Sequence, residues 1–124
     1  MGQRSTELAA GLAMMLWMAP AFAADTANGE SLFKRQCGIC HSAAEGKTLA
    51  GPTLFGLIGR VAGTVPGFRY SAANRDAGFT WDTARLDPYL ANPKDVVPGT
   101  TMMFGGMKDA EQRADLIAYL ATLK

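Results

Sequence analysis

The chain has 124 residues, of which 48% are hydrophobic, and a formal net charge of +1 at pH 7. This length suits one ordinary domain and is too short for two. Nothing in this balanced charge suggests nucleic acid or an acidic membrane surface as a partner, since both need a concentrated basic face.

The first predicted element is a secretory signal peptide. Residues 8–19 read LAAGLAMMLWMA, follow a single arginine and precede the small-residue pattern AFA at 21–23. A positive end, an apolar centre and small residues at the cut are typical of a cleaved signal. The apolar run is shorter than the roughly 20 residues that span a bilayer, although an uncleaved anchor is the alternative. We expect residues 1–23 to be removed after Ala23 and residues 24–124 to form one periplasmic domain.

Helical patterns follow in the mature chain. Residues 26–36 predict a short helix that Asp25 or Thr26 can cap, with Leu32 and Phe33 as its apolar side. The next segment, 41–79, is rich in glycine and proline and lacks strand alternation, so it predicts loop.

Three further segments complete the pattern. The stretch SAANRDAG predicts one helical turn, and WDTARLDPYLANP predicts a short helix that begins at Asp82 and ends before Pro93. VPGTTMMFGGM predicts loop. In DAEQRADLIAYLATLK, Asp109 precedes Gln112 as in a capping box, and the leucines and isoleucine recur at helical spacing: Leu116, Ile117, Leu120 and Leu123.

The sequence therefore predicts an all-α domain with too little apolar core. A few short helices and long Gly/Pro-rich loops do not stabilise a compact domain of this size by themselves. A large buried cofactor would remove the difficulty, because the loops could pack on it.

The motif CGICH holds both cysteines, Cys37 and Cys40, and the only histidine, His41. A thioredoxin-like dithiol needs a preceding strand, which the pattern lacks. A disulfide would close too small a loop to add much stability, and zinc needs four ligands where three are offered. Covalent haem attachment is the interpretation that remains, because two thiols on one helical turn reach the same porphyrin edge and carry the histidine under the ring.

A single histidine excludes bis-histidine iron, so the second axial position belongs to methionine, lysine, water or nothing. Three methionines, Met102, Met103 and Met107, lie in one Gly-rich loop. The rigid Pro-Gly turn in PGTTM favours Met102 as the ligand, with the other two as alternatives.

Further motifs follow CGICH in the order GPTLFGLIGR, PGFRYSAAN, TWD, YLANPK, VPGTTMMFGG and DLIAYL. Together they resemble the class I cytochromes c, that is, mitochondrial-type cytochrome c and its bacterial relatives, from about Gly29 to Leu120. The resemblance implies a small all-α cytochrome c fold. Three to five short helices and long loops would wrap around one covalently attached haem c.

The resemblance also implies residue roles. Cys37 and Cys40 match the haem thioethers, and His41 and Met102 match the iron ligands. Pro52 matches the proline whose carbonyl accepts the hydrogen bond of the histidine ligand. The other matches are propionate partners (Arg60, Tyr70, Asn74, Trp81 and Thr100), the tyrosine near the methionine sulfur (Tyr89), the aromatic at the exposed haem edge (Phe104) and the contact between the first and last helices (Gly29, Phe33, Leu116 and Tyr119).

Without the resemblance, Trp81, Tyr70 and Tyr89 would be read as ordinary core aromatics and Arg60 as a surface charge. The chain also departs from the mitochondrial pattern around the haem edge. Non-basic residues replace part of the lysine ring, in which Lys94 and Lys108 remain: Gln36, Asp95, Thr101 and Asp109. Strong electrostatic steering towards a partner is therefore not expected.

With both axial positions filled and the only histidine on iron, no enzymatic site is expected. The predicted function is that of an exported one-electron carrier between respiratory or dehydrogenase complexes. We expect a monomer that meets redox protein partners, such as a cytochrome reductase or oxidase or a periplasmic dehydrogenase, and reaches a membrane only through them. The alternatives are a small haem peroxidase or gas-binding sensor with an open sixth site, and a dedicated haem subunit of a larger complex.

Overall fold

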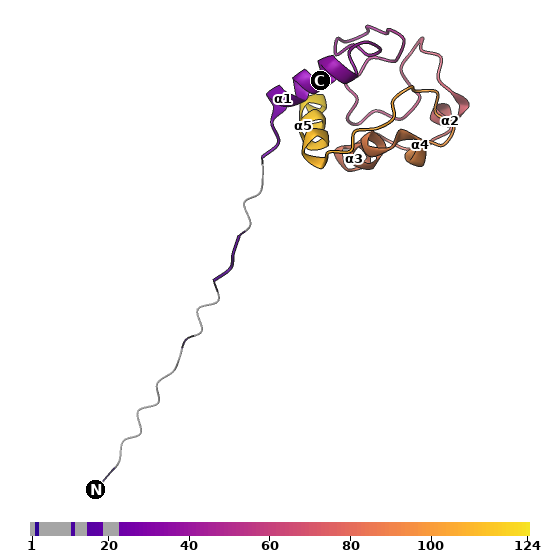
Figure 1. The fold of residues 1–124 in the computed structure, drawn as a ribbon. Helices are drawn as coiled ribbons and strands as arrows, with labels where there is room; N and C mark the ends of the chain where they lie inside the picture. Colours follow the sequence, from indigo (N-terminus) through magenta and orange to yellow (C-terminus); the bar gives the residue numbers. More distant parts are fainter. Residues whose placement is uncertain (1, 3–10, 12–14, 19–22) are drawn as a thin grey trace.

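The computed structural model describes residues 2, 11, 15–18 and 23–124. The predicted signal peptide, 1–23, lies largely outside the described residues. In the described part the chain forms five helices (Figure 1): α1 Thr26–Gln36, α2 Ala72–Arg75, α3 Thr83–Ala91, α4 Pro93–Val96 and α5 Ala110–Ala121. There the only β-type pairing is an isolated bridge between Val61 and Thr80, so the prediction of an all-α fold is confirmed.

The three longer helices begin where their caps predict. At the start of α1, α3 and α5 an aspartate side chain accepts a hydrogen bond, 2.7–3.0 Å long, from the backbone N–H three residues later: Asp25, Asp82 and Asp109. Such a bond satisfies a donor that has no partner within the helix. The short turn α4 was not predicted. Pro93 ends α3 as expected but also begins α4, because the first helical turn needs no proline N–H.

Helices α1 and α5 pack against each other at one end of the domain (Figure 1). A Cβ added to Gly29 would lie 2.0 Å from the carbonyl oxygen of Asp115, so the two backbones approach more closely than any side chain would allow. Beside this point the rings of Phe33 and Tyr119 lie with centroids 5.6 Å apart. The contact predicted between the first and last helices is therefore present.

The Asp115 carboxylate ties the same two helices together. It accepts hydrogen bonds from the backbone N–H of Asp25 at 2.7 Å and from the Asn28 side chain at 2.8 Å. These bonds lower the pKa of Asp115, the Asn28 amide having the larger effect. The start of α1 is thus held by α5.

The apolar core lies between α1, α3 and α5. Its most deeply buried side chains come from all three helices: Leu32, Leu86, Leu116 and Leu120. The long segment between α1 and α2 forms turns that fold back on the domain. Among the described residues, no helix combines the length and the apolar character needed to cross a bilayer.

Candidate functional site

The end of α1 places the CGICH motif. The N–H groups of Cys37 and Gly38 both donate to the Phe33 carbonyl at 2.8 Å, and those of Cys40 and His41 both donate to the Cys37 carbonyl at 3.0 and 2.9 Å. The chain therefore makes one more tight turn beyond the helix. This turn brings both thiols and the imidazole to the wall of one cavity.

The two cysteines are free thiols in this structure. Burial, and secondarily the neighbouring Cys40, raise the pKa of the Cys37 thiol to about 11. A helix rather than a strand precedes the pair, unlike the setting of a thioredoxin-type dithiol. In the described part of the chain, no cluster of three or more His, Cys, Asp or Glu side chains could hold a bare metal ion.

The His41 ring is held from two sides. Its Nδ1 lies 2.7 Å from the Pro52 carbonyl oxygen, and because a carbonyl only accepts, Nδ1 must carry the proton. The lone pair is then left on Nε2, where it can bind a metal. Gly51 lies against the ring so closely that an added Cβ would be 2.4 Å from Cε1. Both contacts fix the imidazole plane.

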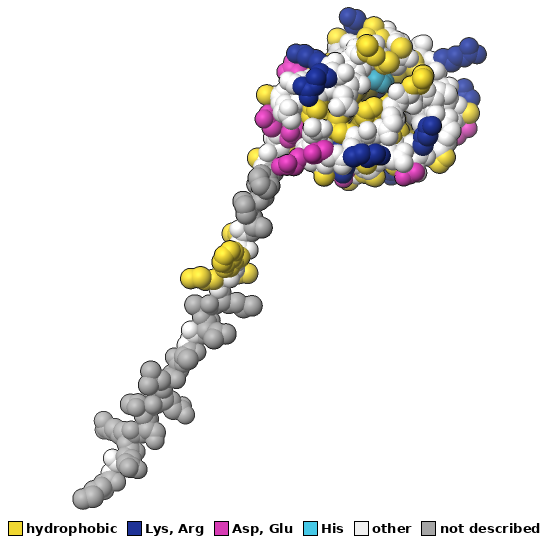
Figure 2. All heavy atoms as spheres, viewed as in Figure 1, with side chains coloured by type: hydrophobic (Ala, Val, Ile, Leu, Met, Phe, Trp, Pro, Cys, Tyr) yellow, Lys and Arg dark blue, Asp and Glu magenta, His cyan; other side chains and the backbone are white. Residues whose placement is uncertain are grey.

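A cavity of about 360 Å³ opens in front of these residues, within the roughly 300–1,000 Å³ of cofactor sites. Figure 2 looks onto a hollow whose visible interior is mostly hydrophobic, with the side chain of the single histidine visible in it. The cavity draws its lining from segments spread between Gln36 and Leu120. An apolar, shaped pocket with a few polar groups suits a flat, largely hydrophobic cofactor.

The three candidate methionines have different environments. Met107 is 4% exposed and belongs to the core, and it does not line the cavity. Met103 lies at the cavity but its side chain is fully exposed. Only Met102 both lines the cavity and is partly shielded from solvent.

The sulfur of Met102 faces Tyr89. The Tyr89 hydroxyl donates to Met102 Sδ at 3.7 Å, and the Met102 N–H donates to Thr100 Oγ1 at 3.3 Å. Burial raises the pKa of Tyr89 to about 12, so the hydroxyl keeps its proton and remains a donor at neutral pH. Tyr89 in turn packs on Trp81, with centroids 4.6 Å apart.

The predicted propionate partners surround the same cavity, with one exception. Arg60, Tyr70, Asn74 and Trp81 line it, whereas Thr100 is buried and does not. Asn74 Nδ2 donates to Thr100 Oγ1 at 3.3 Å, which links Thr100 to a residue that does line the cavity. The Tyr70 hydroxyl accepts the Val65 N–H at 3.0 Å, so its own proton stays free for another acceptor.

Arg60 is already engaged with the backbone. Its guanidinium donates to the carbonyls of Phe55 and Thr53 at 3.2 and 2.9 Å, and burial lowers its pKa. Arg60 therefore shapes the loop between α1 and α2 and also brings a positive charge to the cavity wall. Phe104, predicted at the exposed edge, lines the cavity and is half-buried.

Two features of the site were not assigned from the sequence. Gly51 packs against the His41 ring. The only feature of the sequence that could have indicated this contact is the position of Gly51 directly before Pro52. Arg113 of α5 bonds both the end of the methionine-bearing loop and Asp87 of α3. Nothing in the local sequence around Arg113 predicts these contacts.

Comparison with known proteins supports the interpretation of the cavity. The family model for cytochrome c matches residues 26–124. The chain is 47% identical to cytochrome c of Euglena viridis over 100 residues, covering 81% of this chain and 98% of that protein. It is 51% identical to cytochrome c2 of Rhodomicrobium vannielii over 112 residues, or 89% of each chain, and 51% identical to cytochrome c of Chlamydomonas reinhardtii over 107 residues, or 86% and 96%.

Proposed function

The chain belongs to the cytochrome c family, and we propose that it is an exported one-electron carrier whose single haem c is bound through Cys37 and Cys40 and ligated by His41 and Met102. One observation carries the ligand set. A single apolar cavity gathers two thiols, an imidazole with Nε2 free and a shielded thioether. This donor set fits a haem, which Cys37 and Cys40 would hold through thioethers and whose iron His41 and Met102 would bind through nitrogen and sulfur.

The haem supplies an iron that alternates between the ferric and ferrous states, and the protein sets how readily it does so. Pro52 keeps the proton on His41 Nδ1 and so directs Nε2 into the cavity. A thioether ligand such as Met102 favours ferrous iron and raises the reduction potential relative to a second histidine. Tyr70 and Trp81 would supply donors for buried carboxylates, which would otherwise be costly to desolvate. Asn74 would join them by exchanging a bond that its Nδ2 donates to Ser71 or Thr100.

We further propose that the protein is not an enzyme. Substrate chemistry at the iron needs an open axial position, and the shielded Met102 sulfur, held by Tyr89, is placed to fill it. A haem peroxidase or gas sensor would instead bind carbon monoxide readily at the resting iron.

The partners are proposed to be redox proteins that meet the carrier at its cavity mouth. Acidic and neutral residues, among them Asp95 and Asp109, replace part of the lysine ring of mitochondrial-type proteins. Docking should therefore depend only weakly on salt. The apolar run 8–19 supports export to the periplasm with cleavage after Ala23.

The test is the visible spectrum and mass of the exported holoprotein, compared with Met102→Ala and with Met103→Ala as the matched control. We expect the wild type and Met103→Ala to show a far-red sulfur-to-iron charge-transfer band and no reaction of the ferrous form with carbon monoxide. Met102→Ala should lose the band, bind carbon monoxide and fall in potential by on the order of 100 mV, a fraction of the roughly 0.8 V that axial ligands span. A band that survives in Met102→Ala would refute the ligand set. The intact mass should equal residues 24–124 plus one haem.

A further inference from the structure

The loop that carries Met102 has little regular structure of its own. Residues 101–109 form neither helix nor turn. Near its start, the Met102 N–H is bonded to Thr100 Oγ1 at 3.3 Å. Further along the loop, the Met107 N–H donates to the Leu90 carbonyl of α3 at 2.7 Å. The position of the Met102 side chain therefore depends on how firmly the far end of the loop is held.

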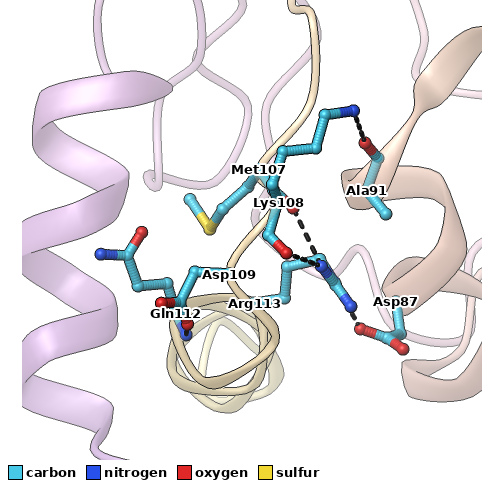
Figure 3. A network of polar contacts seen from close by, with 7 residues as sticks. All are labelled: Asp87, Ala91, Met107, Lys108, Asp109, Gln112 and Arg113. Carbon is cyan, nitrogen blue, oxygen red and sulfur yellow. Dashed lines mark hydrogen bonds and ion pairs between the residues drawn. The ribbon is translucent and has the colours of Figure 1, made fainter.

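Arg113 of α5 holds that far end (Figure 3). Its Nη1 donates to the carbonyls of Met107 at 3.0 Å and Lys108 at 2.9 Å. Its Nε donates to Asp87 Oδ1 of α3 at 2.7 Å. A single guanidinium thus joins the loop, α3 and α5, and its fixed planar geometry suits three bonds at once.

The loop backbone is in direct contact with α3 at this place. Gly106 has a φ of +110°, and a Cβ there would lie 2.1 Å from the Ala91 carbonyl oxygen. The Lys108 ammonium donates to the same oxygen at 3.0 Å (Figure 3). No side chain separates the loop from the helix at Gly106, so the bonds from Arg113 and this close approach together set the positions of the Met107 and Lys108 carbonyls.

Helix α3 contacts the loop at the methionine as well. Tyr89, which donates to Met102 Sδ, lies two residues beyond Asp87 on the same helix. The helix therefore contacts both the methionine sulfur and the end of the segment that presents it. If Met107 and Lys108 were released, the segment between them and Met102 would be tied down only at its start and could move as a whole, carrying the thioether away from the cavity.

We propose that Arg113, oriented by Asp87, is a positioning residue that keeps the Met102 sulfur in the cavity, and that the Arg113–Asp87 pair sets how readily another ligand replaces it. This inference rests on the proposed function, because it concerns the sulfur proposed to bind iron. The Arg113 side chain is only 13% exposed, whereas that of Asp87 is 52% exposed. Asp87 can therefore be changed with little disturbance of the core, while its loss frees one edge of the guanidinium.

The test is displacement of Met102 by added imidazole in the ferric holoprotein, followed through the far-red charge-transfer band. We expect Arg113→Met to speed displacement by about tenfold or more, since charged hydrogen bonds shift equilibria by factors of about 10 to 100. Asp87→Asn keeps an accepting oxygen but loses the charge, so it should speed displacement by a smaller factor, about threefold or more. Asp87→Glu should restore part of the wild-type rate. The matched control is Asp115→Asn, on the same helix, which loosens α1 from α5 without touching the loop and should leave the displacement rate unchanged.

If Arg113→Met does not fold, Asp87→Asn against Asp115→Asn decides the question. The inference would be overturned if the rate of Met102 displacement followed the free energy of unfolding in every variant. It would also be overturned if the rate were unchanged in Asp87→Asn. Neither result would contradict the proposed ligands. A wild-type protein that lacks the charge-transfer band would overturn both the ligand set and this inference.

Discussion

Replacing Gly29 by alanine should force α1 away from α5. The new Cβ would stand 2.0 Å from the Asp115 carbonyl oxygen, 2.6 Å from its carbonyl carbon and 2.9 Å from Tyr119 Cβ. The first two atoms belong to the backbone, so no side-chain rotation relieves the overlap. Reaching an ordinary contact of about 3.4 Å requires a shift of roughly 1.4 Å, and such overpacking costs about 1–3 kcal/mol or more.

Helix propensity acts in the opposite direction in this variant. Alanine is favoured over glycine inside a helix by up to about 1 kcal/mol. The net loss in the free energy of unfolding should therefore be about 2 kcal/mol at the upper end of the overlap cost, a large fraction of the roughly 5 kcal/mol of a weakly stable domain. Guanidinium titration of the holoprotein measures it as a lower midpoint at unchanged slope.

The control for Gly29→Ala is Ser31→Ala, at an exposed position of the same helix. This substitution should change the free energy of unfolding by less than about 0.5 kcal/mol. A Gly29→Ala protein as stable as the wild type would mean that the close approach of the two backbones is not required.

Three further predictions concern single contacts. In Gly51→Ala the new Cβ would meet the His41 ring at 2.4 Å, so we expect a shifted haem spectrum and a loss of about 1–3 kcal/mol in unfolding titrations; a normal spectrum would contradict this. Because hydrogen bonds depress the folded-state pKa of Asp115, its contribution to stability is present above the ordinary value of 3.8 and is lost as the pH falls through the lower folded value. Between about pH 5 and 2, Asp115→Asn should therefore lose less stability than the wild type, and parallel pH profiles would argue against the contact. Tyr89→Phe removes the hydroxyl that donates to Met102 Sδ, and the sulfur then becomes a better ligand for ferric iron. The reduction potential measured by voltammetry should therefore fall by about 20–60 mV. A rise in the potential would refute the role of the hydroxyl.

The sequence predicted the elements whose signals are local. Aspartate caps at Asp25, Asp82 and Asp109 marked the starts of α1, α3 and α5, since a cap and its N–H partner lie three residues apart. Helix α4 was missed because Pro93 serves both as a stop and as a start. Whether Pro93 only ends α3 or also begins α4 depends on how the chain turns at Asn92, and a local sequence pattern does not specify that turn.

The site divides in the same way. The spacing in CGICH predicted the arrangement of thiols and imidazole, because all of its atoms lie on one turn. Preference for Met102 over Met103 agrees with their burial, and it depended on the preceding Pro-Gly turn and on the family resemblance. Contacts between distant segments, such as Arg113 with the Met107 carbonyl, have no local signal and required the structure.

The cavity that joins so many segments also bears on how the cell makes this protein. Its walls are mostly apolar and come from segments spread between Gln36 and Leu120, so without a cofactor these side chains would face water instead of being buried. Without its cofactor the chain would therefore have little to hold these segments together. The domain should fold fully only once its haem is attached.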